Sequence, residues 1–436
     1  MPTSYNSARA PLSRVTLAQV LHLMGYGQSN SVGYLNEPSV TLAQPYANIR
    51  FAGSVRTSRI EGAGVNYGAT EPLVESDHAT GNYGETGVAA AANIFVEKMA
   101  GYAAYPSQGF VLHGSTAGNP GQQIENIGKG SVYYADWQAM IAAARANAQA
   151  AGRSYAYLAT DWTQGEQDQL QGDNRAEHKL KLMTLAADLR DDARAATGQA
   201  WAPIMVASQI ANHMTYRQDG GPLTRPEITL AIRDAGLDDP DLFVTTPLYW
   251  ADYVDGRHLD NHSQQMRGKY QGRAAAAIML ARLRGQPDPV VSVDLVSALW
   301  QDKLCLLRFQ VPVAPLAFDT SWISAAPNKG FDLWSADGAT RLDNITAVDL
   351  IGPDGVLVTF SSTPPTGARL TYGFGRDEVT AGRVAGPRGQ LRDSAGLADS
   401  YVDATGATRR LHNYCLIFET IKPDPAVAGG EVVRRR

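Results

Sequence analysis

A serine between two polar side chains follows directly after an apolar run near the start of the chain. In "LMGYGQSNSVG", residues 23–33, Ser29 comes after a stretch typical of a buried strand and is flanked by glycines. A hydroxyl at the end of a strand can act as a nucleophile when a base accepts its proton. Serine is also common as a cap at strand-to-helix turns, so the assignment depends on partners elsewhere in the chain.

A base and its orienting carboxylate stand together in "YVDGRHLDNH", residues 253–262. Asp255 and His258 are three residues apart and follow a strand-like run. A carboxylate in this position can hold one imidazole nitrogen while the other nitrogen faces the end of the strand. Taken alone, the stretch is more typical of a plain Asp-Gly turn with a surface histidine.

Two further stretches could hold a developing negative charge. In "ATDWTQGEQDQ", residues 159–169, the Gln164 amide can donate to an oxyanion, and Glu166 and Asp168 can support the loop by accepting hydrogen bonds. In "VLHGSTAG", residues 111–118, the Gly114 amide has no side chain to block close approach. All four stretches come at the ends of predicted strands.

The elements that must position these residues alternate along the first part of the chain. Strand-like runs are "LAQVLHLMG", "GFVLHG", "SYAYLATDW", "APIMVAS" and "DLFVTTPLYW", and helical patterns cover residues 85–100, 136–151, 174–197, 225–235 and 260–284. This alternation predicts a parallel sheet covered by helices on both faces. Such sheets bind ligands at the carboxyl ends of their strands, where the four stretches fall.

The pattern changes after Pro287. Alternating stretches such as "AVDLIGPDGVLVTF" and "GARLTYGF" predict antiparallel strands, with "PDG" as a hairpin turn. We expect a first domain over residues 1–301 with a loop-rich insertion at 34–84, an all-β domain over 302–423, and a flexible tail over 424–436. The β domain either binds glycans or caps the first domain, and Trp334 and Tyr372 either stack on sugars or lie in its core.

The four stretches, in this order, resemble the SGNH hydrolase superfamily, and within it the sialate O-acetylesterase-like and carbohydrate acetylesterase branch. The resemblance rests on "GQSN", on "WTQGEQD" for the motif W-x-Q-G-E, and on Asp255-x-x-His258. It implies an α/β fold with a three-layer α/β/α, flavodoxin-like parallel sheet, followed here by the all-β sandwich-like domain. His113 replaces the first of two glycines that the family usually has before Ser or Thr.

The resemblance also implies roles for individual residues. Ser29 would be the nucleophile, His258 the base and Asp255 its orienter. The amides of Ser29 and Gly114 and the Gln164 side chain would form the oxyanion hole, and the loop would be supported by Trp162, Glu166 and Asp168. The expected activity is removal of O-acetyl groups from a carbohydrate or polysaccharide through an acyl-enzyme, with no cofactor and no metal.

Two other functions compete with this hypothesis. Asp255, His258 and His262 could bind zinc, although no Glu follows His258 and no cysteine cluster is present. Alternatively, the chain could be a spike or fibre protein of a phage-like particle that binds cell-surface polysaccharide with an esterase-like fold, with particle proteins as partners.

Composition excludes several classes of partner. The chain has 436 residues, a net charge of -5 and no basic block, which argues against nucleic acid as a partner. The best apolar stretch, residues 274–283, is too short to cross a bilayer and contains Arg282. No secretory signal is recognisable, so we expect a cytoplasmic protein or one released in a phage-like particle. Cys305 and Cys415 lie in strand-like runs and are expected to be buried free thiols.

Overall fold

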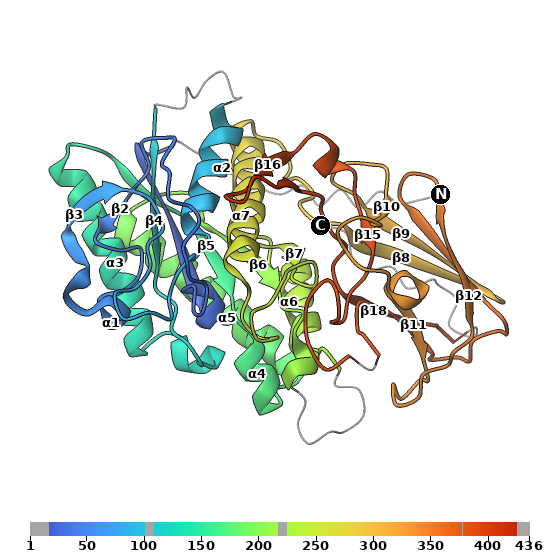
Figure 1. Cartoon of the computed structure of the whole chain (residues 1–436). Helices are drawn as coiled ribbons and strands as arrows, with labels where there is room; N and C mark the ends of the chain where they lie inside the picture. The colour runs from blue at the N-terminus through green and yellow to red at the C-terminus, as the bar shows by residue number, and fades with distance from the viewer. Residues whose placement is uncertain (1–16, 101–108, 217–224, 377, 425–436) are drawn as a thin grey trace.

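A computed structural model of the chain describes residues 17–100, 109–216, 225–376 and 378–424. Its first part is built around a seven-stranded sheet with the order β3-β2-β4-β1-β5-β6-β7, in which only β3 is antiparallel to its neighbour (Figure 1). The strands are β1 (Val20–Gly27), β2 (Ile49–Ala52), β3 (Asn66–Pro72), β4 (Val111–Thr116), β5 (Tyr155–Thr163), β6 (Ile204–Gln209) and β7 (Leu242–Pro247). The five predicted strands are confirmed as β1, β4, β5, β6 and β7.

Helices cover both faces of this sheet, as the alternating pattern predicts. One apolar layer lies between the sheet and α2 and α7, and a second lies between the sheet and α3, α5 and α6. The helices are α1 (Ser58–Glu61), α2 (Val88–Ala100), α3 (Val132–Ala150), α4 (Glu166–Gln171), α5 (Arg175–Thr197), α6 (Glu227–Asp238) and α7 (Asn261–Leu283). The start of α5 is capped by Asn174 and that of α7 by Asp260, whose side chains accept backbone amides of the first turn.

Small residues let α2 and α7 pack closely. A Cβ atom on Gly268 would lie 2.0 Å from the Gly87 carbonyl oxygen, and one on Gly272 would lie 2.0 Å from that of Ala91. Any larger side chain at either glycine would push the two helices apart. The loop before α7, which carries two of the candidate catalytic residues, is therefore attached to a firmly held helix.

The expected loop-rich insertion at residues 34–84 contributes to the sheet. It contains β2, which pairs parallel with β4, and β3, which pairs antiparallel with β2 at the sheet edge. The run "NIRFAGSV" predicts β2, but β3 has every second residue exposed and carries no apolar run. An edge strand of this kind is held by backbone hydrogen bonds more than by burial, which is why its sequence reads as a loop.

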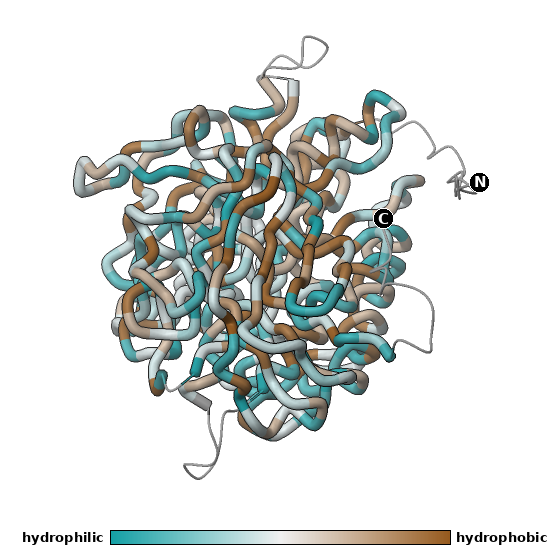
Figure 2. Tube along the Cα trace, turned by 90° about the vertical axis from the view of Figure 1, so that its right-hand side faces the viewer, coloured by the Kyte–Doolittle hydropathy of each residue, from teal (hydrophilic) through white to brown (hydrophobic). Residues whose placement is uncertain are grey.

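The second part of the chain consists of antiparallel sheets. One has the order β12-β13-β9-β8 and another β11-β14-β18, with two small pairs, β10-β15 and β16-β17, beside them. The strands are β8 (Asp294–Gln301), β9 (Leu304–Gln310), β10 (Ala317–Phe318), β11 (Phe331–Trp334), β12 (Ile345–Ile351), β13 (Gly355–Phe360), β14 (Arg369–Tyr372), β15 (Leu391–Arg392), β16 (Ser400–Val402), β17 (Thr408–Arg410) and β18 (Phe418–Ile421). We call residues 294–424 the β region. Figure 2 looks onto it and shows apolar segments running next to one another through its middle.

One apolar core joins the β region to the first part of the chain. It includes Leu248, Tyr249 and Tyr270 from the first part and Phe331 and Phe418 from the β region, all buried. The Gln209 side chain, at the end of β6, bonds both the amide (2.7 Å) and the carbonyl (2.9 Å) of Ile417. The two parts therefore share one apolar core and are also joined by hydrogen bonds.

Several expectations about the β region can be compared with the structure. The expected boundary at 301/302 falls in the turn between β8 and β9, which pair antiparallel, so β8 belongs to the β region. The hairpin at "PDG" is confirmed as β12 and β13. Tyr372 and Trp334 are both buried, which places them in the core rather than on a sugar-binding face.

The structure also bears on redox state and membrane insertion. Cys305 and Cys415 are buried free thiols, as expected. Among the described helices, none combines the length and apolar character needed to span a bilayer. Residues 1–16, on which the expectation of no secretory signal rests, and residues 425–436 of the expected tail lie outside the described residues.

Candidate active site

The candidate nucleophile lies in the turn that follows β1, in the middle of the sheet. β1 ends at Gly27, and Ser29 begins the short 3-10 helix Ser29–Ser31. Gly27 has φ 138°, and a Cβ atom on it would lie 2.1 Å from the Thr163 carbonyl oxygen, so only glycine lets the chain turn this close to β5. The amide of Gln28 donates to the same carbonyl (3.1 Å). This turn holds Ser29 at the carboxyl end of β1.

Asp255 and His258 reach Ser29 from the loop between β7 and α7. His258 Nε2 lies 3.1 Å from Ser29 Oγ, and His258 Nδ1 lies 2.9 Å from Asp255 Oδ2. The other carboxylate oxygen of Asp255 accepts the amides of Arg257 (2.9 Å) and His258 (2.8 Å). The structure thus places the three side chains in one hydrogen-bonded row.

The surroundings of Asp255 favour its charged form. Burial alone would raise the pKa of Asp255, but hydrogen bonds from the His258 amide and ring and from the Arg257 amide together lower it. An ionised carboxylate accepts the Nδ1–H of the imidazole, which leaves Nε2 as the acceptor that faces Ser29. In this tautomer His258 can take the proton of the Ser29 hydroxyl.

Two asparagines that the sequence analysis did not assign hold the backbone next to His258. Asn30 accepts the Leu259 amide (3.1 Å) and donates to the Arg257 carbonyl (3.2 Å) and to Glu166 (3.0 Å). Asn212, after β6, donates to the same carbonyl (3.0 Å) and to the same carboxylate (3.4 Å). Burial raises the pKa of Glu166. Asn212 could have been found from sequence, because it is a polar residue just beyond the carboxyl end of a predicted strand.

The loop after β5 contains the other residues of the W-x-Q-G-E motif. Trp162 is buried in the core beneath the loop. The NH2 group of Gln164 donates to the Gln122 carbonyl (3.1 Å) and to the Asp168 carboxylate, and Gln164 Oε1 is buried with no hydrogen bond among the described residues. Within the described ranges, Gln164 and Ser29 are not joined by a hydrogen bond. Both amide hydrogens of Gln164 are therefore engaged elsewhere in this state.

The glycine that lies beside the nucleophile turn is not Gly114. Gly114 is inside β4, opposite Leu23 of β1, and a Cβ atom on it would lie 2.7 Å from a methyl group of Leu73. The absence of a side chain at Gly114 therefore makes room for Leu73 to pack against the sheet. Gly118, four residues further on, lies where a Cβ atom would come within 1.9 Å of Ser31 Oγ. Gly118 therefore lies next to the turn that carries Ser29, whereas Gly114, the expected oxyanion-hole residue, pairs with Leu23 inside the sheet.

The β region holds the loop that carries Asp255 and His258, which we call the triad loop (residues 251–260). The Arg383 amide donates to the Ala251 carbonyl (3.1 Å), and the Arg383 guanidinium donates to Asp252 (3.0 Å). The same guanidinium lies 4.0 Å from the centre of the Trp322 ring. Residues far along the chain thus fix one end of the triad loop.

Two half-buried tyrosines flank the triad on the side of the insertion. The Tyr34 ring lies edge-on to the His258 ring at 5.1 Å, and the Tyr83 ring lies edge-on to that of Tyr34 at 5.3 Å. Backbone pairing between Tyr34 and Tyr83 keeps the two rings together. The insertion therefore places an aromatic surface next to the imidazole.

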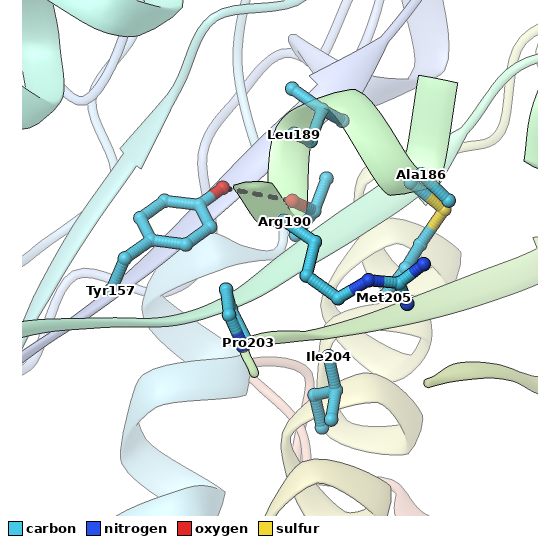
Figure 3. A pocket seen from close by; sticks show the side chains of 8 residues that line it. Tyr157, Ala186, Leu189, Arg190, Pro203, Ile204 and Met205 are labelled. Carbon is cyan, nitrogen blue, oxygen red and sulfur yellow. Dashed lines mark hydrogen bonds between the residues drawn. The ribbon is translucent and has the colours of Figure 1, made fainter. Parts of the chain in front are cut away.

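The zinc arrangement considered from sequence is not assembled. Both ring nitrogens of His258 contact triad residues, while His262 Nδ1 lies 3.9 Å from Asp403 of the β region. A small pocket lies at the other end of the sheet, near the amino ends of β5 and β6 (Figure 3). Its lining consists of Tyr157, Thr160, Ala186, Leu189, Arg190, Pro203, Ile204 and Met205. None of these is a candidate catalytic residue, so the pocket is not part of this site.

Comparison with known proteins supports the fold. No family model and no curated protein matches the chain. A carbohydrate acetylesterase from Xanthomonas citri is similar in structure with a TM-score of 0.56 at 15% identity, covering 92% of this chain and 80% of that one. The chain therefore has a fold similar to that of this carbohydrate acetylesterase. Because the similarity covers 92% of this chain, it extends beyond the α/β part into the β region.

Two other solved structures match a smaller share of the chain. A protein from Arabidopsis thaliana has a TM-score of 0.39 at 17% identity and covers 59% of this chain. An aryl esterase from Mycobacterium smegmatis has a TM-score of 0.31 at 11% identity and covers 60% of this chain. The matches cover 98% and 99% of those two proteins, respectively.

Proposed function

We propose that this chain is a serine esterase that removes O-acetyl groups from a carbohydrate or polysaccharide. The observation that carries the proposal is the row of Asp255, His258 and Ser29, with contacts of 2.9 and 3.1 Å. A hydroxyl, an imidazole in the right tautomer and an ionised carboxylate are sufficient for acyl transfer without a metal.

The reaction proceeds in two halves. Ser29 Oγ attacks the carbonyl carbon of the ester while His258 Nε2 takes its proton, and Asp255 stabilises the imidazolium that forms. The tetrahedral intermediate collapses, the sugar oxygen leaves with the proton from His258, and the acetyl group stays on Ser29. A water molecule then attacks this acyl-enzyme with His258 again as base, which releases acetate and restores the Ser29 hydroxyl.

The oxyanion of the intermediate needs donors near Ser29. Among the described residues, the amides of Ser29 and Gly118 donate to no hydrogen-bond acceptor, and Gly118 lies beside the nucleophile turn. We assign these two amides to the oxyanion hole, with Gly118 in place of Gly114. Gln164 becomes a third donor when its amide turns away from Gln122.

The choice of a carbohydrate rests on the surroundings of the triad. The similar protein from Xanthomonas citri is a carbohydrate acetylesterase. In addition, the half-buried rings of Tyr34 and Tyr83 lie next to His258, where they can pack against the apolar face of a sugar. The leaving group of the ester would contact this surface.

The decisive test is hydrolysis of an aryl acetate by full-length protein. Ser29→Ala should lower kcat/KM by about three to six orders of magnitude without loss of folding. Ser31→Ala is the matched control, because Ser31 Oγ donates to the Gln28 carbonyl (2.6 Å) and does not touch His258. Ser31→Ala should keep the rate within about tenfold of wild type. A Ser29→Ala variant with more than a tenth of the wild-type rate would contradict the proposal.

Acetate release from acetylated polysaccharides then tests the substrate class. Wild type should release acetate from an acetylated polymer, and Ser29→Ala should not. Tight binding of the polymer with no acetate release from it or from the aryl acetate would instead support the alternative function, an esterase-like fold used for recognition by a phage-like particle.

A further inference from the structure

His178 is a buried histidine without a hydrogen bond. It lies in the first turn of α5 and is fully shielded from solvent. Within the described ranges, neither of its ring nitrogens has a hydrogen-bond partner, and the closest charged atom is Asp168 Oδ1, 3.5 Å from Nδ1. A buried polar group without a partner destabilises the folded state unless a water or an ion contacts it.

Two carboxylates converge on this ring. Ligand atoms of Asp168, Asp173 and His178 all lie within 4.8 Å of one another, and no other such trio of His, Cys, Asp or Glu occurs in the part of the chain that the structure describes. An ion bound tetrahedrally at about 2.1 Å holds neighbouring ligand atoms about 3.4 Å apart. The 3.5 Å between His178 Nδ1 and Asp168 Oδ1 is too long for a good hydrogen bond but fits two ligands of one ion.

We propose that Asp168, Asp173 and His178 form a binding site for one divalent transition-metal ion, for which Zn²⁺ is the best candidate. One imidazole nitrogen and two carboxylate oxygens are a donor set that zinc accepts, with a water molecule as the fourth ligand. Calcium and magnesium prefer sites made entirely of oxygen, so the imidazole disfavours both. The Asp173 side chain is 12% exposed, which gives an ion access to an otherwise buried site.

Lys181 balances the charge of the site when no ion is bound. Its ammonium group lies 2.8 Å from Asp173, and also 3.3 Å from Glu125 and 3.1 Å from Glu177. When a metal ion binds Asp173, Lys181 can keep its contacts with the two glutamates, which are more exposed. The ion therefore takes the place of the Lys181 ammonium group beside Asp173, and Lys181 keeps Glu125 and Glu177 as partners.

The proposed metal site contains none of Ser29, Asp255 and His258, and it shares only Asp168 with the loop that carries Gln164. Asp168 also accepts the Ile124 amide (3.2 Å) and the side-chain amide of Gln164. An ion on Asp168 would therefore fasten the start of α5 to the loop that carries Gln164. Its role is to stabilise this loop, and no step at Ser29 involves it.

The test measures metal binding directly, in untagged full-length protein stripped of metal with a chelator. Calorimetric titration with Zn²⁺ should give one site per chain with a Kd below about 10 µM, and Mg²⁺ and Ca²⁺ should bind at least about tenfold more weakly. Zn²⁺ should also raise the Tm of the stripped protein. Absence of zinc binding by the wild type, or preference for Mg²⁺ or Ca²⁺, overturns the proposal; absence of any binding would leave a water molecule as the partner of His178.

Variants locate the site. His178→Asn should weaken zinc binding by at least about tenfold and abolish the Tm increase. Asp173→Asn changes a partly exposed residue and should weaken binding similarly even if the buried His178 variant does not fold. His262→Asn is the control, because His262 also lies near a carboxylate, at 3.9 Å from Asp403, and is not part of the proposed metal site. Zinc binding that survives Asp173→Asn but is lost in His262→Asn overturns the assignment, and none of these outcomes depends on esterase activity.

Discussion

Removal of the β region should unfold the α/β part rather than release an independent esterase. A chain that ends at Gln286 loses the partners of seven buried side chains, each at most 3% exposed in the full chain. They are Leu230, Leu248, Tyr249, Trp250, Leu259, Met266 and Tyr270. Full burial of such a side chain contributes about 1.5–3 kcal/mol. If truncation uncovers only half of each, the loss is about 5–10 kcal/mol, against a total stability of about 5–15 kcal/mol.

Lost hydrogen bonds add to this cost. The Tyr249 hydroxyl donates to the Cys415 carbonyl (2.7 Å), and that of Tyr270 donates to the His412 carbonyl (2.6 Å). Both hydroxyls are buried, so each depends on a partner that the truncation removes. The shortened chain should therefore expose an apolar surface and aggregate.

The assay compares the shortened chain with full-length protein for soluble yield, size-exclusion profile and hydrolysis of an aryl acetate. Full-length Ser29→Ala is the control that is folded but inactive, so loss of activity can be separated from loss of folding. A soluble, monomeric chain of residues 1–286 with more than about a tenth of the full-length kcat/KM would refute the reasoning.

Three further predictions address single residues. Asp255→Asn keeps the shape but favours the wrong tautomer of His258, so kcat in the aryl acetate assay should fall about ten-thousandfold; a fall of less than about tenfold would remove Asp255 from the triad. Gln164→Ala should lower kcat about a hundredfold with KM unchanged if the amide turns to the oxyanion, whereas a rise in KM alone would assign Gln164 to substrate binding. Burial lowers the pKa of His113 to about 3, so between about pH 6.5 and pH 4 the imidazole is protonated in the unfolded chain but neutral in the folded one. The free energy of unfolding should therefore fall by about 1.4 kcal/mol for each pH unit over this range. His113→Phe should reduce this acid slope, measured by denaturant unfolding, and an unchanged slope would contradict a neutral buried His113.

The strands and helices of the α/β part could be predicted because burial leaves a clear pattern. β1 is buried along its whole length between β4 and β5, so it reads as a continuous apolar run. The triad candidates could be found because polar residues at the ends of such runs must meet at one edge of a parallel sheet. The same reasoning applied to "SQIANH" would also have found Asn212.

The remaining features depend on how deeply a residue is buried and on which residue it faces across the sheet, and a single sequence shows neither. Gly114 and Gly118 both follow the start of β4, and only the pairing of Gly114 with Leu23 shows that it lies inside the strand. The expected boundary at 301/302 falls in the tight turn between β8 and β9, where Asp302 has φ 48°, and only the pairing of these two strands shows that β8 belongs with the β region. The unsatisfied ring of His178 is a property of packing alone.

The contacts of Arg383 with the triad loop have a consequence for how the protein is made. Ser29, Asp255 and His258 have all been synthesised when little more than half of the chain has left the ribosome. The Arg383 contacts with Ala251 and Asp252, and the Trp322 hydrogen bond to the Trp250 carbonyl (2.9 Å), form only after the β region has followed. Domains at the N-terminus generally fold first during synthesis, but here the loop that completes the triad waits for the last third of the chain. A nascent or prematurely ended chain therefore holds all three candidate catalytic side chains but lacks the contacts that fix the triad loop.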